Sequence, residues 1–437
     1  MFKLKNKLIF FIGLSLFINP LSLVQAKTFK IATYNIENLF DLEKSGNEYI
    51  EYVPNNIFCW NEKNFNLKLN NISAVLKDLN ADIIALQEIE SESALQSLQT
   101  RLREKNLEYK YSAIAKVKNT TVKCAVLSKY PIIKTQEILI PDSKTRNILK
   151  VLIDLENNPL ILYINHWKSK SGPESLRIES AQALRKDIEH LPADTDFIIL
   201  GDFNSNYNEY QSIKKIKRLN NRDGLTGINH ILKTTADSKM VTEQLLSQEQ
   251  SNPLLYNLWL EIPAAQRWSY DSTGSKDSPD SIILNQGLYD NKGIAYIDNS
   301  FSRFTPAYLF KHGEVFRWQK AKNGAGMHLG SGYSDHLPIF ALFSAEPFSF
   351  KKANKPLLAD DLSVNNQAIQ TQGLVDLNIG TKKELMAISG IGKVLADKII
   401  AGRPYQSIDD LIKVNGIGKK KLESIRGYLI IQNKQNQ

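Results

Sequence analysis

The chain has 437 residues, a formal net charge of +9 and two cysteines. This length allows one to three domains with a large hydrophobic core, and two cysteines exclude a metal centre built from thiolates alone. The excess of Lys and Arg favours an anionic partner, but charge alone leaves open whether that partner is nucleic acid, anionic lipid or the cell surface.

The first 26 residues have the pattern of a secretory signal peptide. Three lysines within the first seven residues precede an apolar stretch over 8–17, and the segment ends in a small residue, Ala26. This apolar stretch is shorter than the roughly 20 residues that cross a bilayer. We therefore expect residues 1–26 to be removed and the protein to be secreted or periplasmic, with a retained N-terminal anchor as the alternative.

The two cysteines of the chain have two possible states. In an oxidising compartment, Cys59 and Cys124 could form a disulfide bond. However, Cys124 lies in "TVKCAVLSKYPI", a strand-like run in which a small thiol packs well without a partner. The sequence leaves both states open.

From Lys27 to about Ala345, strand-like apolar runs alternate with amphipathic helical patterns. Strands are predicted in "FKIATYNI", "ADIIALQEI", "TVKCAVLSKYPII", "ILKVLIDL", "LILYINHW", "DFIILGDFN", "SIILNQGLY" and "HLPIFALF", and helices at about 67–79, 94–105, 175–190 and 209–219. Several of these runs are apolar almost throughout, which is typical of strands that are buried on both faces. The run from Thr121 to Trp167 holds three strands without room for a helix, so part of the sheet is antiparallel. We therefore expect an α/β domain with mixed sheets.

Polar side chains follow several of these strands. They are Asn35, Glu88, His166, Asp202 and Asn204, and Asp335 and His336 stand at the start of the last apolar run. Ligand sites of open α/β sheets form at the carboxyl ends of strands, so these side chains are expected to converge. The set is rich in oxygen and lacks thiols, which suits a hard cation such as Mg²⁺ better than zinc. Each residue also has a local alternative, because "GDFN" could be a turn, Glu88 a helix cap and His166 a core histidine.

Five motifs of the chain resemble those of the endonuclease/exonuclease/phosphatase family, which includes pancreatic-type deoxyribonucleases, apurinic endonucleases and neutral sphingomyelinases. The motifs "YNIENLF", "LQEIE", "NHWKSK", "GDFNS" and "YSDHLPI" occur in the family's order over nearly all of Lys27–Phe343. The resemblance implies a four-layer α-β-β-α sandwich and metal-dependent hydrolysis of phosphodiesters. It implies Mg²⁺, with Mn²⁺ or Ca²⁺ as alternatives, bound by Asn35, Glu88 and Asp335, and His166, Asp202, Asn204 and His336 around the scissile phosphate.

Hydrolysis of a phosphodiester needs charge neutralisation on the phosphate, a positioned water molecule and a proton acceptor. Either His336 or Asp202 could accept that proton, and the sequence does not choose between them. In the resembled family, an Asp in a strand pairs with the last His; the candidate here is Asp280 in "SPDSIIL", which lacks the usual flanking residues, so a loop Asp is the alternative. Lys168 and Arg177 follow the His166 motif, and they either bind flanking phosphates or form a solvated basic loop.

The C-terminal region begins with a segment of different composition. Residues 346–372 carry Lys, Asn, Gln and Pro with little periodicity, which is typical of a linker. Residues 373–432 contain a repeat, in which "ELMAISGIGK" and "DLIKVNGIGK" align at an offset of 26 residues. The copies begin with capping-box patterns at Thr381 and Glu384, and at Ser407 and Asp410. Each copy therefore predicts a helix, a tight Gly-Ile-Gly turn and a second helix.

This repeat resembles the double helix-hairpin-helix module of DNA-repair proteins and bacterial DNA-uptake receptors. Glycines allow the backbone to come close to a ligand, and the amides at the start of the following helix face an anion. From Thr371 onward there are 11 Lys or Arg and 6 Asp or Glu, a surplus of +5. A helical hairpin that binds protein is the alternative. The residues expected to bind the DNA backbone are Gly390, Ile391, Gly392, Lys393, Gly416, Ile417, Gly418 and Lys419.

Together these features predict a secreted, Mg²⁺-dependent endonuclease with an α/β sandwich domain at 27–345 and a small all-α domain that holds DNA. Because such hairpins contact the duplex backbone, the expected partner is double-stranded DNA, cut with little sequence preference. One alternative is a phosphodiesterase of the same family that acts on lipid or small phosphate esters. Another is a surface protein that captures DNA without catalysis.

Overall fold

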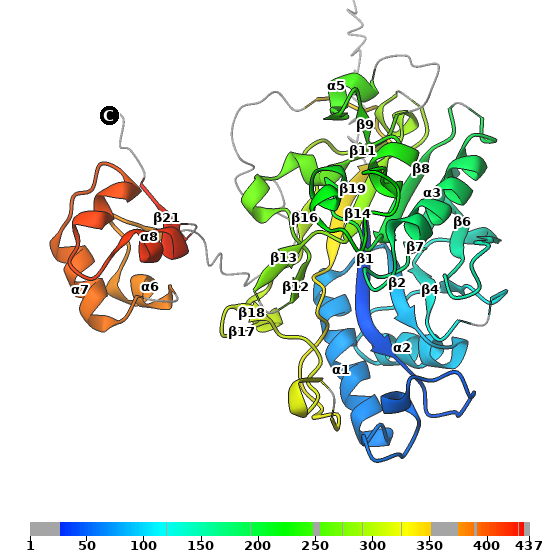
Figure 1. Cartoon of the computed structure of the whole chain (residues 1–437), viewed down its shortest axis with the longest axis horizontal. Helices are drawn as coiled ribbons and strands as arrows, with labels where there is room; N and C mark the ends of the chain where they lie inside the picture. The colour runs from blue at the N-terminus through cyan, green and yellow to red at the C-terminus, as the bar shows by residue number, and fades with distance from the viewer. Residues whose placement is uncertain are drawn as a thin grey trace, which may run out of the picture. The chain divides into compact units, whose positions relative to one another are not determined.

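The computed structural model describes residues 27–350 and 375–431, except for 119, 193, 248–253, 273, 291, 325, 389–390 and 427. The chain divides into two compact units, Met1–Lys351 and Lys352–Gln437, at a point inside the predicted linker (Figure 1). The predicted signal peptide and most of the linker lie outside the described residues. Within the described part of the chain, no helix has the length and apolar character needed to cross a membrane.

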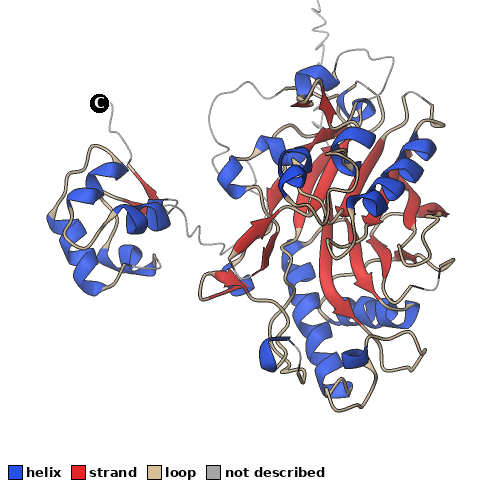
Figure 2. Ribbon diagram, in the orientation of Figure 1, coloured by secondary structure: helices blue, strands red, loops and turns tan. Residues whose placement is uncertain are grey.

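Two large sheets form the centre of the first unit, as the described residues show (Figure 2). The first sheet has the order β15-β19-β1-β2-β4-β3, with β16 paired to β19, and the second has the order β11-β14-β8-β7-β6-β5. The strands of the first are β1 (Thr28–Leu39), β2 (Ile83–Ile89), β3 (Tyr111–Ile114), β4 (Lys123–Ser128), β15 (Ala295–Tyr296), β16 (Ser302–Arg303) and β19 (Ile339–Ser344). Those of the second are β5 (Ile132–Ile138), β6 (Ile148–Leu155), β7 (Asn158–His166), β8 (Phe197–Asp202), β11 (Tyr256–Asn257) and β14 (Asp280–Leu284).

Both sheets are mixed, as predicted. Strand β1 is parallel to β2 and antiparallel to β19, while β7 is parallel to β8 and antiparallel to β6. Smaller two-stranded pairs lie outside the sheets: β9 (Thr235–Ala236) with β10 (Lys239–Met240), β12 (Tyr270–Ser272) with β13 (Ser275–Asp277), and β17 (Phe310–Lys311) with β18 (Glu314–Val315).

Helices cover the outer face of each sheet. On the first sheet they are α1 (Glu62–Leu79) and α2 (Glu92–Glu104), and on the second α3 (Glu174–Ile188) and a π-helical turn, η3 (Gly227–Ile231). The helices α4 (Glu209–Ser212) and α5 (Glu243–Leu246) are shorter, and Leu246 of α5 belongs to the core between the sheets. Short 3₁₀ turns are η1 (Ile50–Tyr52), η2 (Ile213–Lys215), η4 (Leu258–Glu261), η5 (Ala264–Gln266), η6 (Gln286–Tyr289), η7 (Ala307–Leu309) and η8 (Lys322–Gly324). Asn61 and Ser91 cap the N-termini of α1 and α2, because their side chains accept from backbone N–H groups three residues on.

Three apolar clusters define four layers. The first lies between the sheets and contains Ile31 of β1 and Leu200 of β8. Because neighbouring strand residues face opposite sides, Ala32 belongs to a second cluster with α1 and α2. A third cluster joins Ile199 of β8 to Leu184 of α3. This arrangement confirms the predicted α-β-β-α sandwich.

Three local predictions need correction or are now decided. The predicted helix at 209–219 is wrong beyond α4 and η2, because Ile216 leaves the helical region with φ −112° and ψ 82°. The run "TVKCAVLSKYPII" contains two strands, not one, since β4 and β5 belong to different sheets. Cys59 and Cys124 are both free; Cys124 is buried in the core between the sheets, as the packing alternative predicted.

The second unit consists of two helical hairpins closed by a short parallel pair of strands. Its elements are β20 (Val375–Asp376), α6 (Lys382–Ala387), α7 (Lys393–Ala401), η10 (Ile408–Lys413), α8 (Lys419–Arg426) and β21 (Leu429–Ile430). The capping boxes predicted at Thr381 and Ser407 are both present. Helix–turn–helix order is thus confirmed in both copies, although the first helix of the second copy is 3₁₀. The core of this unit includes Leu385, Ile399 and Leu411.

Candidate active site

Five strands bring polar residues to one edge of the sandwich. Asn35 and Glu88 come from the parallel strands β1 and β2, and His166 and Asp202 end the parallel strands β7 and β8. Strand β14 runs antiparallel to β8, so its first residue, Asp280, is paired in register with Asp202. His166 is paired with Asp202 on the other side. The pairing therefore brings together residues that are far apart in the sequence, as the strand-end argument predicted.

Asn35 links the two sheets at this edge. Its Nδ2 donates to Glu88 Oε1 at 3.1 Å and to Asp202 Oδ2 at 3.0 Å. Its Oδ1 accepts from the backbone N–H of Glu37 at 3.0 Å, and the residue is buried. These contacts fix the position of the amide between two carboxylates.

Glu88 has an unusual backbone conformation. Its φ is +69°, in the left-handed region that residues other than glycine rarely occupy. The registers of β1 with β2 and of β2 with β4 both shift next to this residue, as at a β-bulge. Burial raises the pKa of Glu88, the charge of Asp335 raises it further, and the charge of Arg146 lowers it. The bulge thus holds an acidic side chain in a site that disfavours its negative charge.

His166 is a buried, uncharged imidazole. Its Nε2 lies 3.5 Å from Asp202 Oδ2 and 3.7 Å from Glu88 Oε1, and its buried Nδ1 has no partner among the described residues. Burial, followed by the positive charges of Arg146 and His336, holds the pKa of His166 well below its ordinary value. His166 is therefore neutral near pH 7, and it can donate or accept a single hydrogen bond within the site.

In contrast to His166, His336 is positively charged, because a buried carboxylate stabilises its protonated form. Its Nδ1 donates to Asp280 Oδ2 at 2.7 Å, and Ser269 Oγ donates to the same oxygen at 2.6 Å. Burial by itself lowers the pKa of His336, but the charge and hydrogen bond of Asp280, together with the charge of Asp202, hold it well above its ordinary value. The geometry thus joins the last His to Asp280, despite the unusual residues beside that Asp.

The neighbouring Asp335 belongs to a second group of charges. Arg317 Nη2 lies 3.1 Å from Asp335 Oδ2, and the same guanidinium pairs with buried Glu37. Burial raises the pKa of Glu37 to about 7, and the charge of Asp335 adds to this effect against the opposing charge of Arg317. Lys68, whose pKa burial lowers to about 8, donates to the backbone oxygen of Tyr333 at 2.8 Å. Arg317, Glu37 and Lys68 therefore place further charges close to Asp335.

Asp202 and Asn204 lie together at the end of β8. Asp202 Oδ1 accepts from the backbone N–H of Asn204 at 2.8 Å, and Asn204 Nδ2 donates to Asp202 Oδ2 at 3.2 Å. Burial raises the pKa of Asp202 to about 6, against the charge of His336, which lowers it. The "GDFN" motif thus forms a turn and also places Asp202 and Asn204 in the candidate site.

Sequence reasoning missed two residues at this edge. Arg146, in the loop before β6, donates from Nη1 to the backbone oxygen of Trp167 at 3.5 Å, and its charge lowers the pKa of both Glu88 and His166. Tyr270 places its ring centroid 4.9 Å from that of His336. Neither residue follows a long apolar strand, so the signal that identified the other site residues was absent.

The donor set at this edge fits a hard divalent cation. Glu88 and Asp335 are the more accessible carboxylates, with side chains 19% and 14% exposed, and Asn35 adds an amide beside Glu88. The like charges of Glu88 and Asp335 raise the pKa of Glu88, and a cation between them would relieve this repulsion. Glu88 and Asp335 offer carboxylate oxygens, which Mg²⁺, Mn²⁺ and Ca²⁺ prefer, whereas Asn35 directs its Nδ2 toward Glu88 and would have to turn its amide over to offer its oxygen.

A separate acidic group lies among other elements. Glu243 of α5, Glu261 of η4 and Asp298, which follows β15, have carboxylate oxygens within 4.8 Å of one another. Tyr296 donates to Glu261 Oε2 at 2.5 Å, and Tyr289 donates to Glu243 Oε1 at 3.2 Å. None of the three carboxylates was predicted as a metal ligand, and their environment is the core between the sheets.

The two basic residues predicted near His166 differ in their surroundings. Lys168 is half-buried, and its predicted phosphate contact stays a prediction. The same prediction for Arg177 is wrong, because its side chain is 0% exposed. Arg177 instead pairs with Glu174 at 2.7 Å and donates to the backbone oxygens of Lys168 and Ser169, both at 3.1 Å. Arg177 therefore shapes the loop after β7 from inside.

In the second unit, the predicted DNA-binding residues separate into core and surface. Ile391 and Ile417 are 3% and 4% exposed and belong to the core, so their prediction as DNA contacts is corrected to a role in holding the turns. Gly390 lies outside the described residues. The other predicted residues, Gly392, Lys393, Gly416, Gly418 and Lys419, are exposed. A Cβ atom added at Gly392 or at Gly418 would meet nothing within 4 Å, so the chain itself leaves the backbone at both turns open to an external ligand.

Two segments of the chain match models of known protein families. Residues 30–239 match the model of the Endonuclease/Exonuclease/phosphatase family, and residues 370–430 match that of the helix-hairpin-helix motif. The chain is similar to a "Deoxyribonuclease" of Thioalkalivibrio sp. (strain K90mix), with 34% identity over 93 residues, which are 21% of this chain and 23% of that protein. It is also similar to "ComE operon protein 1" of Bacillus subtilis (strain 168), with 38% identity over 73 residues, which are 15% of this chain and 36% of that protein.

Solved structures with similar backbones have low sequence identity. A humanized TDP2 of D. rerio covers 72% of this chain and 98% of its own, with 13% identity and a TM-score of 0.46. SmcL covers 73% of this chain and 99% of its own, with 17% identity and a TM-score of 0.42. The two curated relatives match this chain over well under two thirds of their own length. By its matched segments, the chain carries a domain of the Endonuclease/Exonuclease/phosphatase family and a C-terminal helix-hairpin-helix motif.

Proposed function

We propose that the protein is a secreted or periplasmic, divalent-metal-dependent endonuclease that hydrolyses DNA phosphodiester bonds with little sequence preference. The observation that carries this proposal is the convergence of Glu88, His166, Asp202 and the Asp280–His336 pair at one edge of the sandwich. Carboxylates beside a neutral and a charged imidazole suit an anionic substrate that needs both a proton acceptor and hydrogen-bond donors.

Each residue of the site has a separate role in hydrolysis. The oxygen of a water molecule forms a bond to phosphorus while one ester P–O bond breaks, and the products are a phosphate monoester and an alcohol. Asp202 accepts the proton of the water, because its pKa of about 6 leaves it ionised at pH 7 and still basic enough to take a proton. The departing oxygen receives a proton from solvent.

The imidazoles stabilise charge on the phosphate. His336 is held as a cation by Asp280, so its Nε2–H donates to a non-bridging oxygen, which leaves Asp202 rather than His336 as the base. His166 donates from Nε2 to a second oxygen. A divalent cation held by Glu88, Asn35 and Asp335 would supply further positive charge to the phosphate.

The helix-hairpin-helix unit favours one class of substrate within this proposal. Its exposed turns at Gly392 and Gly418 precede the helices α7 and α8, whose first residues are Lys393 and Lys419. Backbone amides and lysines at such turns bind phosphates without reading the bases, which favours duplex DNA over a lipid or a small phosphate ester. The relative's name, Deoxyribonuclease, supports the same substrate.

The proposal is tested with the purified full-length protein on circular plasmid, single-stranded DNA, RNA and sphingomyelin, each with Mg²⁺ and with chelator. We expect nicking of the plasmid that requires the metal, and loss of nicking in His336→Ala with DNA binding retained. Hydrolysis of sphingomyelin without nicking of DNA would assign the protein to the lipid-active alternative. Full activity of His336→Ala would contradict the role given to the Asp280–His336 pair.

A further inference from the structure

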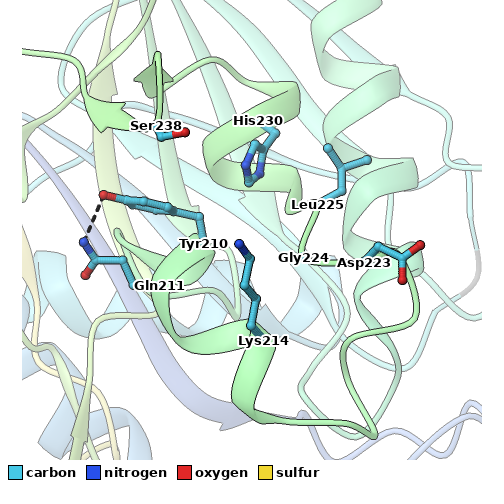
Figure 3. A pocket seen from close by; sticks show the side chains of 8 residues that line it. All are labelled: Tyr210, Gln211, Lys214, Asp223, Gly224, Leu225, His230 and Ser238. Atoms are coloured by element: carbon cyan, nitrogen blue, oxygen red, sulfur yellow. Dashed lines mark hydrogen bonds between the residues drawn. The ribbon is translucent and has the colours of Figure 1, made fainter.

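A cavity lies beside α4, outside the candidate active-site residues described above (Figure 3). Its volume is about 570 Å³, within the range of sites that hold small organic ligands. It is formed by α4 and η2, by the loop before η3, by η3 itself and by the turn between β9 and β10. The lining residues are Tyr210, Gln211, Lys214, Asp223, Gly224, Leu225, His230 and Ser238.

The cavity presents a positive charge and several hydrogen-bond donors. In the described part of the chain, no carboxylate pairs with Lys214, and Figure 3 shows its amine extending toward Tyr210 and His230. His230 Nδ1 accepts from the backbone N–H of Thr226 at 2.9 Å, so Nε2 carries the hydrogen atom and is free to donate. The hydroxyl of Tyr210 accepts from Gln211 Nε2 at 2.9 Å, which leaves its own hydrogen for a ligand.

The acidic residue of the lining does not cancel this charge. Asp223 is exposed, and in Figure 3 its carboxylate points away from Lys214. The nearby Glu209 already pairs with Lys170, whose Nζ lies 3.3 Å from Glu209 Oε2. A ligand in the cavity therefore meets the positive charge of Lys214 without a competing acid.

The surface next to the cavity is strongly basic. Between Glu209 and Asp223 there is no acidic residue. The exposed residues of this segment include Lys214, Lys215, Lys217, Arg218 and Arg222. We call these five residues the basic segment.

The basic segment is connected to the loops of the candidate active site. Arg218 Nη1 donates at 2.6 Å to the backbone oxygen of Lys170, in the loop that follows His166. The helix α4 begins five residues after Asn204. Through Arg218, the basic segment therefore contacts the loop that follows His166.

We propose that this cavity binds one nucleotide of the DNA strand on one side of the scissile phosphate, with its phosphate held by Lys214, His230 and Tyr210. The inference rests on the proposed nuclease function and assigns a subsite to it. The volume exceeds the needs of a bare phosphate, and the ring of Tyr210 and the side chain of Leu225 provide apolar surface for a sugar and a base. The donors here suit phosphate oxygens rather than the edge of one base, so the subsite does not select a sequence.

The first experiment measures binding alone, with thymidine 5′-monophosphate and with inorganic phosphate, to the full-length protein in chelator. We expect the nucleotide to bind, Lys214→Gln to weaken it at least tenfold, and the matched exposed variant Lys134→Gln to leave it unchanged. Weakening of nucleotide binding by Lys214→Gln, which lies outside the candidate active site, separates the cavity from that site. Equal affinity of Lys214→Gln and the parent would overturn the proposal, and so would binding of inorganic phosphate as tightly as the nucleotide.

The second experiment asks whether the ligand is part of a strand. In steady-state cleavage of DNA with Mg²⁺, Lys214→Gln should raise KM at least fivefold and change kcat less than twofold. The slope of log affinity against log salt should decrease by about 0.7–0.9, as for the loss of one phosphate contact. Nucleotide binding without any change in KM would show a site for free nucleotide and overturn the strand assignment. Absence of cleavage in the parent would refute the nuclease proposal. The binding experiment would still show whether the cavity binds a nucleotide.

Discussion

The pairing of Asp280 with His336 makes a quantitative prediction. Replacing Asp280 by Asn keeps the shape of the side chain but removes the charge opposite His336 Nδ1, 2.7 Å away. A hydrogen bond to a charged group contributes about 1.5–3 kcal/mol, which corresponds to a loss of about 10- to 150-fold in kcat if it acts in the transition state. Replacement by Ala also removes the hydrogen-bond acceptor of His336 Nδ1, so we expect a larger loss of kcat than for Asn, together with a loss of folding stability of about 3–5 kcal/mol.

The assay is steady-state nicking of plasmid, with kcat corrected for the folded fraction at the assay temperature. We expect the order parent, Asp280→Asn, Asp280→Ala, with KM for DNA within threefold because the helix-hairpin-helix unit is unchanged. Asp237→Asn is the matched control, since Asp237 is exposed in a turn with φ +49°, a conformation that Asn tolerates. Activity of Asp280→Asn within twofold of the parent would refute the reasoning, as would an Ala variant that is more active than the Asn variant.

Three further outcomes are expected. Glu88→Gln should weaken binding of Mn²⁺ at least tenfold, measured by titration of the apoprotein, and an unchanged affinity would remove Glu88 from the metal site. A chain that ends at Ser349 should bind DNA more weakly and with a smaller dependence on salt; the same salt slope in fluorescence anisotropy would mean that the hairpins do not contact phosphate. Burial raises the pKa of Glu261 to about 8, so the unfolded state ionises first and stability falls between about pH 4.5 and 8, by about 1.4 kcal/mol for each pH unit. Glu261→Gln should therefore raise the unfolding temperature at pH 8 but not at pH 4.5, and equal shifts at both would contradict this account.

Strand periodicity and strand-end chemistry predicted most of the candidate site. Glu88, His166 and Asp202 each follow an apolar run, and parallel pairing of β1 with β2 and of β7 with β8 brings such ends together. The partner of His336 was harder to predict, because Asp280 begins its strand instead of ending it. It reaches the site only because β14 runs antiparallel to β8, and strand direction is a property of the whole sheet.

Arg146 and the buried Arg177 show a different limit of sequence reasoning. A basic residue in a loop looks the same in the sequence whether it faces solvent, a ligand or the interior. Arg177 is buried with its Nε paired to Glu174, one helical turn earlier, and its Nη1 bonded to backbone oxygens of the preceding loop, while its Nη2 has no partner among the described residues. These hydrogen-bond partners of Arg177 are known only from the three-dimensional structure. The sequence therefore allowed a phosphate contact that the structure rules out.

The adjacent residues Asp335 and His336 lie close together but have different main partners. His336 forms a bridge with Tyr270, and its Nε2 lies 3.9 Å from Asp335 Oδ1, so the two side chains stay close to each other. Asp335 Oδ2 pairs with Arg317, while His336 Nδ1 donates to Asp280. One dipeptide thus supplies a ligand to the proposed cation and a donor to the phosphate.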